Sequence, residues 1–80
     1  MLISYDNDAK ALYITLLSEA RVARTVEFNP ETYVDLTKKG ELIGVEMLNP
    51  NHSDLCRLAK KYHQPELSRI HPEKFLKAVA

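Results

Sequence analysis

Acidic residues are the first candidates for chemistry in this chain of 80 residues. Asp6, Asp8, Asp35 and Glu46 could form a carboxylate site for a metal or for acid–base catalysis, since carboxylates serve both purposes. The simpler interpretation places the first two in a turn and leaves Asp35 and Glu46 solvated or paired with a base. The bases considered are Lys10, Arg21 and Arg24. We favour this interpretation. No EF-hand spacing follows Asp6 and Asp8, which argues against specific calcium binding.

A second set of reactive residues lies near the end of the chain: His52, Cys56, His63 and His71. On a helix, His52 and Cys56 would stand four residues apart, and four nitrogen or sulfur ligands suit zinc. The spacing fits no zinc finger or ribbon, and nothing in the sequence fixes a base beside Cys56. We therefore expect Cys56 to be a small buried residue. We predict no catalytic residue, metal ligand or cofactor, and a binding module rather than an enzyme.

Short apolar segments with a period of two indicate the strands that must position the acids. The expected strands are residues 2–5, 11–17, 21–28, 33–37 and 42–48, separated by turn residues. Arg24 interrupts the apolar row of the third strand, which indicates either a bulge or a sheet edge. The pattern thus predicts that residues 2–48 form an antiparallel β-meander of four to five strands.

The register of the last hairpin can be argued from burial. Pairing Thr37 with Leu42 across a loop containing Gly40 makes one face of the hairpin continuously apolar. The expected apolar pairs are Leu36 with Ile43 and Val34 with Val45. The opposite face then has Asp35 opposite Gly44 and Tyr33 opposite Glu46, so Asp35 and Glu46 form a candidate polar cluster.

After Asn49-Pro50 the apolar period becomes helical. A helix over 52–63 would bury Leu55, Leu58, Ala59 and Tyr62, with Asn51 or Ser53 as N-cap and Pro65 beyond its end. A second helix is expected from Pro72, burying Phe75, Leu76 and Val79. The fold class is therefore α+β, with one or two C-terminal helices packed on one sheet face. We expect a single domain, 1–80, made of a β core (2–50) and a helical tail (51–80).

The net charge of the chain is zero, but its charged residues are distributed unevenly along the sequence. Residues 1–50 hold eight acids and five bases, whereas residues 51–80 hold three acids and six bases. The bases of the tail are Arg57, Lys60, Lys61, Arg69, Lys74 and Lys77. A basic tail could contact nucleic acid, but a neutral chain lacks the basic excess of a dedicated binder. A single cysteine and the lack of a long apolar run predict a cytoplasmic protein that does not enter membranes.

Several short motifs together resemble a known family. They are Tyr5-Asp6, Ala11-Leu12-Tyr13-Ile14, Val34-Asp35-Leu36, Gly40 and the LIGVEML segment, residues 42–48. Over residues 2–50 this combination resembles the prokaryotic domain-of-unknown-function family twenty-two eighty-three. The resemblance implies a small sheet domain from a bacterium or archaeon and no particular reaction, and some relatives are associated with toxin–antitoxin-like gene pairs. Lys10 stands where the family usually has an acid.

Two functions from different classes follow from these observations. The first is an interaction module that self-associates as a dimer or higher oligomer, or binds a small protein in the manner of an antitoxin. Its candidate surface is the sheet face left uncovered by the helices, with Tyr13, Leu17, Tyr33 and Leu48. The second is a nucleic-acid-binding regulator that uses the basic tail. Steep salt dependence would distinguish the second from the first.

Overall fold

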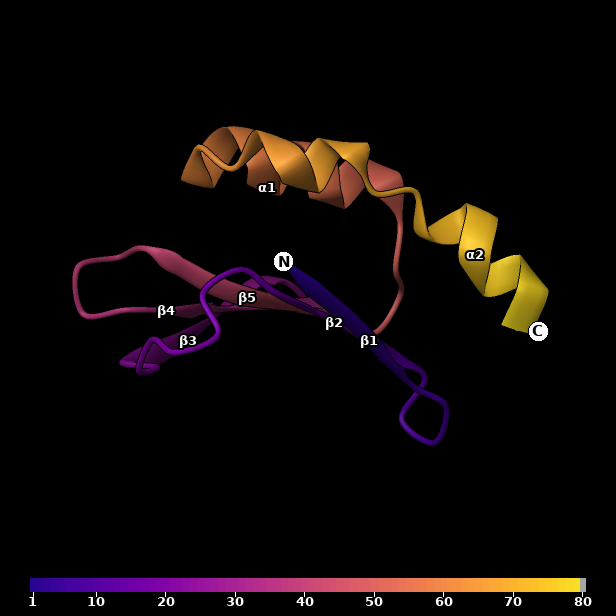
Figure 1. Cartoon of the computed structure of the whole chain (residues 1–80), viewed down its shortest axis with the longest axis horizontal. Helices are drawn as coiled ribbons and strands as arrows, with labels where there is room; N and C mark the ends of the chain where they lie inside the picture. Colours follow the sequence, from indigo (N-terminus) through magenta and orange to yellow (C-terminus); the bar gives the residue numbers. More distant parts are fainter. Residues whose placement is uncertain (80) are drawn as a thin grey trace. The chain divides into compact units, whose positions relative to one another are not determined.

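The computed structural model describes residues 1–79, apart from the side chains of residues 75 and 77–79. The chain divides after Asn49 into two units. The first unit contains only strands and their turns, and the second contains only helices (Figure 1). The change from period two to helical spacing after Asn49-Pro50 therefore marks a real structural boundary.

The first unit is a five-stranded antiparallel sheet, as expected for the fold class. Its strands are β1 (Leu2–Asp6), β2 (Ala11–Thr15), β3 (Arg24–Asn29), β4 (Thr32–Leu36) and β5 (Leu42–Met47). Their spatial order is β1-β2-β5-β4-β3, which differs from a sequential meander because β5 lies between β2 and β4. β5 is almost entirely buried, so it belongs in the middle of the sheet, whereas β3 is largely exposed and forms an edge.

The predicted register of the last hairpin is confirmed over most of its length. Val34 pairs with Val45, Asp35 with Gly44, and Tyr33 with Glu46. The expected pairing of Leu36 with Ile43 is wrong, because the register shifts after Asp35 and Leu36 pairs with Leu42.

Ile43 is the extra residue at this register shift. Its carbonyl accepts the N–H groups of Leu16 and Leu17 at 2.7 and 3.2 Å. This irregularity joins the end of β2 to β5 and starts the connection that leads to β3.

One face of the sheet forms its core. Leu12, Ile14, Val34, Val45 and Met47 have no exposed surface. They come from three adjacent strands and share a face, since Leu12 pairs with Met47 and Ile14 with Val45. The side-chain period of two thus directs the opposite face, with Tyr13, Asp35 and Glu46, away from this core.

Two turns show how the polar residues around the strands are used. The Asp6 carboxylate accepts the backbone N–H groups of Asp8 and Ala9 at 2.9 and 3.2 Å, which confirms its predicted turn role. Lys10 closes this turn with φ 53°, and Gly40 has φ 90° in the β4–β5 turn. Arg24 lies on the edge strand β3 and pairs in regular register with Leu36, so the edge explanation of its position holds. The register shift of β3 lies farther along the strand, between Glu27 and Asn29, and does not explain Arg24.

The second unit consists of α1 (His52–Tyr62), the 3-10 helix η1 (Pro65–Arg69) and α2 (Pro72–Val79). The Asn51 side chain caps α1 by accepting the N–H of Asp54 at 2.8 Å. His63 ends the helix in the left-handed conformation, two residues before Pro65. Of the side chains expected to be buried in the second helix, Leu76 is partly exposed, and those of residues 75 and 79 lie outside the described set.

Leu55, Leu58 and Ala59 of α1 are buried as predicted, whereas Tyr62, at the last position of the helix, is only half-buried. Within the described residues, no helix has both the length and the apolar character needed to cross a membrane.

Candidate functional site

A polar network crosses the sheet face opposite the core. The Tyr13 hydroxyl on β2 donates to Asp35 Oδ2 on β4, with 2.5 Å between the oxygens. The Thr25 hydroxyl on β3 donates to Asp35 Oδ1, also at 2.5 Å. Because β5 lies between β2 and β4, the tyrosine side chain passes over a whole strand to reach the carboxylate. One carboxylate therefore links three strands.

Gly44 on β5 provides the space for this crossing. It lies between Thr15 of β2 and Asp35 of β4 in the two ladders. A Cβ atom at this position would lie 2.5 Å from the Tyr13 hydroxyl oxygen and 2.9 Å from the Ile14 carbonyl oxygen. Real Cβ atoms do not approach so closely, so any residue other than glycine would displace the tyrosine or the backbone.

The environment of Tyr13 keeps its hydroxyl protonated. Burial, the hydrogen bond to Asp35 and the negative charges of Asp35 and Glu46 raise the pKa of Tyr13 from 10.0 to about 12. A tyrosine with this pKa is a hydrogen-bond donor at physiological pH and not a base. Each Asp35 carboxylate oxygen also accepts a hydrogen bond from a hydroxyl group. The network is therefore a structural link between strands.

The two acids of the predicted polar cluster lie on the same sheet face, beside Tyr13, but in different environments. Asp35 is half-buried and bonded to hydroxyl groups, so the expectation that it is merely solvated or paired with a base is wrong. Glu46 is exposed and stands opposite both Tyr13 and Tyr33. The sequence could place Asp35 on this face, but the Tyr13 contact depends on β5 lying between β2 and β4.

The residues of the predicted interaction surface do not form one patch. Tyr13 and Tyr33 share a face, on either side of Glu46. Leu17 follows the end of β2, where its N–H bonds to Ile43, and Leu48 follows the end of β5. Since β2 and β5 are antiparallel, these two leucines lie at opposite ends of the strand pair.

The two sheet edges differ strongly. On β1, Leu2 and Ile3 are 64% and 40% exposed, and all five residues pair regularly with β2. On β3, the exposed residues include Arg24 and Glu27, and a register shift interrupts the strand. Charges and bulges are the usual devices that prevent edge strands from pairing. β3 therefore has a protected edge, whereas β1 has an open one.

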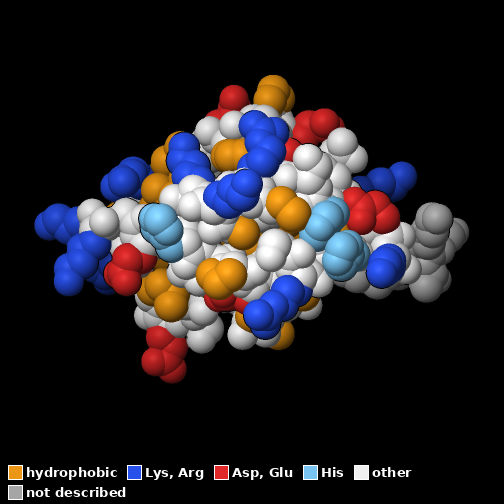
Figure 2. Space-filling view, turned by 90° about the horizontal axis from the view of Figure 1, so that it is seen from above, with side chains coloured by type: hydrophobic (Ala, Val, Ile, Leu, Met, Phe, Trp, Pro, Cys, Tyr) orange, Lys and Arg blue, Asp and Glu red, His pale blue; other side chains and the backbone are white. Residues whose placement is uncertain are grey.

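The second unit brings three of the four residues considered for zinc close together. The His52 and His71 rings stack at 3.9 Å between centroids, and two pale blue side chains lie against each other in Figure 2. Cys56 is half-buried, with Sγ 3.2 Å from His52 Nε2, whereas we expected it to be fully buried. His63 is at the other end of α1. Among the described residues, no group of three or more His, Cys, Asp or Glu side chains could hold a metal ion.

Glu73 supports this histidine pair. Its Oε1 accepts the backbone N–H of His52 at 2.7 Å. This hydrogen bond is the main reason why the pKa of Glu73 lies below its ordinary value. The carboxylate therefore joins the start of α2 to the start of α1.

The bases proposed for nucleic-acid contact are mostly exposed. Arg57 forms an ion pair with Asp54 at 3.3 Å within α1. Lys60 and Lys61 are exposed in the last turn of α1. Arg69 and Lys74 are also exposed, and the side chain of residue 77 lies outside the described set.

Comparison with known proteins identifies the sheet unit. A family model described as "Protein of unknown function (DUF2283)" matches residues 2–49, which include the whole sheet and the Tyr13–Asp35–Thr25 network. No curated protein and no solved structure matches the chain.

Proposed function

The chain belongs to the DUF2283 family, and we propose that its sheet is a non-catalytic interaction module that pairs with a second copy of itself through β1. The observation that carries this proposal is the contrast between the two edges. β3 has charges and a bulge, whereas β1 presents exposed Leu2 and Ile3 on a regular strand. An edge strand leaves one side of its backbone hydrogen-bonding groups unpaired, and a second strand can satisfy them.

A second copy suits this edge because β1 is self-complementary. In an antiparallel pair of β1 strands with two-fold symmetry, a residue near the middle of the strand stands opposite itself. If Ser4 is that residue, Ile3 stands opposite Tyr5 of the second copy and Leu2 opposite Asp6. No like charges then oppose each other, and the Ile–Tyr pairs are of a favourable aromatic–aliphatic kind.

The size of the contact predicts a moderate affinity. β1 has five residues, and each backbone hydrogen bond contributes only about 0.5–1.5 kcal/mol net. Burial of Leu2 and Ile3 adds an apolar contribution that scales with the buried area, about 25 cal/mol per Å². The hydrogen bond from Tyr13 to Asp35 holds β2 in place within the sheet, and β2 is the strand to which β1 is bonded. The polar network therefore also stabilises the position of β1.

Disulfide trapping tests the pairing directly. The experiment uses Ser4→Cys in a Cys56→Ser background, so that the introduced thiol is the only one in the chain. Directly opposite Cβ atoms on paired strands lie about 4.5–5.5 Å apart, close to disulfide distance. We expect mild oxidation to give a covalent dimer on a non-reducing gel.

The matched control is Glu27→Cys on the other edge, in the same background. It should remain monomeric, because Arg24 and the register shift keep β3 from pairing. Equal cross-linking of the two variants would indicate random collision and would contradict the proposal. A β1 variant that does not cross-link at high concentration would contradict it as well.

A different small protein could add to the same edge, as an antitoxin-like role would require. In that case Ser4→Cys would not cross-link to itself but would form a disulfide with a cysteine introduced into the pairing strand of the other protein. The nucleic-acid alternative has weaker support, because Arg57 is already paired with Asp54. The edge contrast therefore favours pairing through β1 over nucleic-acid contact, and the self-complementarity of β1 favours a second copy over a different protein.

A further inference from the structure

Cys56 and His52 lie four residues apart on α1, outside the segment that matches the family model. The distance from Cys56 Sγ to His52 Nε2 is 3.2 Å, within hydrogen-bond reach for sulfur. A thiol beside an imidazole that is itself held in place is the arrangement by which proteins activate cysteine nucleophiles. This pair is independent of the β1 edge.

The surrounding contacts fix which nitrogen of His52 faces the thiol. His52 Nδ1 lies 2.9 Å from the Ile70 carbonyl oxygen, and a carbonyl can only accept. Nδ1 therefore carries the ring proton, so Nε2 of the neutral ring has a free electron pair directed at Cys56. The His71 ring stacks on the His52 ring and restricts its orientation. The Glu73 carboxylate accepts the backbone N–H of His52 and so holds the backbone of this residue.

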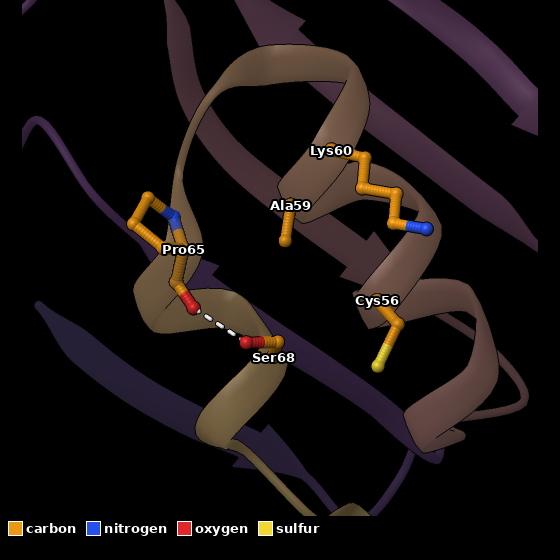
Figure 3. Close-up of a pocket in the computed structure, with 5 residues that line it drawn as sticks. All are labelled: Cys56, Ala59, Lys60, Pro65 and Ser68. Atoms are coloured by element: carbon orange, nitrogen blue, oxygen red, sulfur yellow. Dashed lines mark hydrogen bonds between the residues drawn. The ribbon is translucent and has the colours of Figure 1, made fainter.

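Cys56 also lines an open pocket of about 260 Å³ between α1 and η1. The lining residues are Cys56, Ala59, Lys60, Pro65 and Ser68. In Figure 3 the Cys56 thiol and the Ala59 methyl group point from α1 toward the side where Pro65 and Ser68 lie. The Ser68 hydroxyl donates to the Pro65 carbonyl at 2.7 Å, so its hydrogen is not available to a ligand.

The lining determines which ligands suit the pocket. Its walls are mostly apolar, and Lys60 is its charged lining residue. The volume allows a few non-hydrogen atoms beside the thiol. A small molecule with an aliphatic body and a carboxylate would therefore place its chain against Ala59 and Pro65 and its charge near the Lys60 ammonium group.

We propose that Cys56 is a thiol-exchange site for small disulfides that carry a carboxylate, with His52 as the proton acceptor and Lys60 as the contact for the anionic group. The thiol proton passes from Cys56 Sγ to His52 Nε2. The thiolate attacks one sulfur of the disulfide R–S–S–R, so that a Cys56–S–S–R bond forms and the original S–S bond breaks. The leaving thiolate takes the proton from His52 and departs as R–SH. The small disulfide is the oxidant, and one mixed disulfide and one thiol are the products.

The first experiment measures the reaction of the full chain with bis(carboxymethyl) disulfide at neutral pH by intact-protein mass spectrometry. Cys56→Ser is the blank. We expect the wild type to form the mixed disulfide. His52→Ala and His52→Gln should react at least about tenfold more slowly, since a positioned base contributes at least this much. Absence of the mixed disulfide in the wild type would overturn the proposal.

His52→Gln distinguishes proton transfer from simple support of the helix. Glutamine can bond to the Ile70 carbonyl but cannot take up the thiol proton. A glutamine variant that reacts as fast as the wild type would show that His52 only holds the structure. Circular dichroism melting curves identify any variant that is unfolded. If both His52 variants are unfolded, formation of the mixed disulfide by the wild type still tests the proposal.

The anionic preference is tested with a neutral reagent, hydroxyethyl disulfide. The ratio of interest is the reaction rate with bis(carboxymethyl) disulfide divided by the rate with hydroxyethyl disulfide. We expect Lys60→Gln to lower this ratio about threefold, the size of the effect of one exposed ion pair. Lys61→Gln is the matched control, because Lys61 is on the same turn of α1 but does not line the pocket. Equal wild-type rates with the two reagents, or equal effects of the two lysine substitutions, would overturn the assignment of Lys60.

Discussion

Asp35 and Gly44 have complementary roles on one face of the sheet. Asp35 accepts hydroxyl hydrogen bonds from two other strands, and Gly44 leaves room for the tyrosine that makes one of them. Hydrogen bonds to charged groups contribute about 1.5–3 kcal/mol each, more than bonds between neutral groups. These few residues are therefore expected to contribute strongly to the stability of a small sheet.

Gly44→Ala should destabilise the protein by about 1–3 kcal/mol, the usual cost of overpacking. The added methyl group would overlap the Tyr13 hydroxyl and the Ile14 carbonyl. Urea unfolding of the variant and the wild type measures the difference. In a Tyr13→Phe background the same substitution should cost less, because the nearest clashing atom is gone. A Gly44→Ala protein as stable as its parent would contradict this account of the crossing.

The raised pKa of Tyr13 predicts a loss of stability at high pH. The folded-state pKa is about 12 and the ordinary value is 10.0, so the folded protein holds this proton more tightly than the unfolded chain does. Its contribution is fully present below pH 10 and is lost as the pH rises from about 10 to about 12.

Ultraviolet titration of tyrosinate checks this value. The chain has four tyrosines, and the wild type should show one late-titrating phase that Tyr13→Phe lacks. Asp35→Asn should shift that phase toward lower pH, because the negative charge that opposes ionisation is removed. An unchanged titration in both variants would place the phase on another tyrosine.

At the scale of elements, α1 shows how a helix boundary is chosen. Asn51 and Ser53 are both plausible N-caps by type, and the structure assigns the role to Asn51 through its bond to the Asp54 N–H. Asn51→Ala should therefore cost about 1 kcal/mol of unfolding free energy, the typical value for a lost cap.

Ser53→Ala is the matched control for this prediction. Ser53 is exposed inside the first turn, so its replacement should change stability by less than about 0.5 kcal/mol. Thermal melting followed by circular dichroism compares the two variants. Equal losses from the two substitutions would indicate that the capping interaction contributes nothing specific.

At the scale of the whole molecule, the open β1 edge predicts reversible self-association. Sedimentation velocity should show an average mass above the 9.2 kDa of one chain at micromolar concentration and a fall toward it on dilution. Leu2→Lys should keep the protein monomeric, because a charge on an edge strand opposes pairing. Val26→Lys places the same change on the protected edge, where Val26 is 38% exposed, and should leave association unchanged.

Moderate ionic strength should affect this association little, since β1 pairing rests on backbone hydrogen bonds and apolar contact. A wild-type protein that sediments as a monomer at every concentration would refute self-pairing. It would leave β1 as the edge for a different protein chain.

The sequence by itself determined the local structure of this protein. Alternation placed the five strands and the core face, with Val34 opposite Val45 and Asp35 opposite Gly44. Helical spacing and Pro65 predicted α1, with its N-cap left open between Asn51 and Ser53, and the short motifs indicated the family. These features can be read from the sequence because they depend on neighbouring residues, on the side-chain period and on turn chemistry.

Only the tertiary structure decided which of these elements are neighbours. Strand order put β5 between β2 and β4, and this alone lets Tyr13 reach Asp35 across Gly44. It also made β1 an open edge. The fold of the helical tail fixed the His52 ring by the Ile70 carbonyl, and this directs Nε2 at Cys56. Such contacts join residues far apart in the chain, and a periodic pattern specifies which face a side chain occupies but not which strand or loop lies beside it.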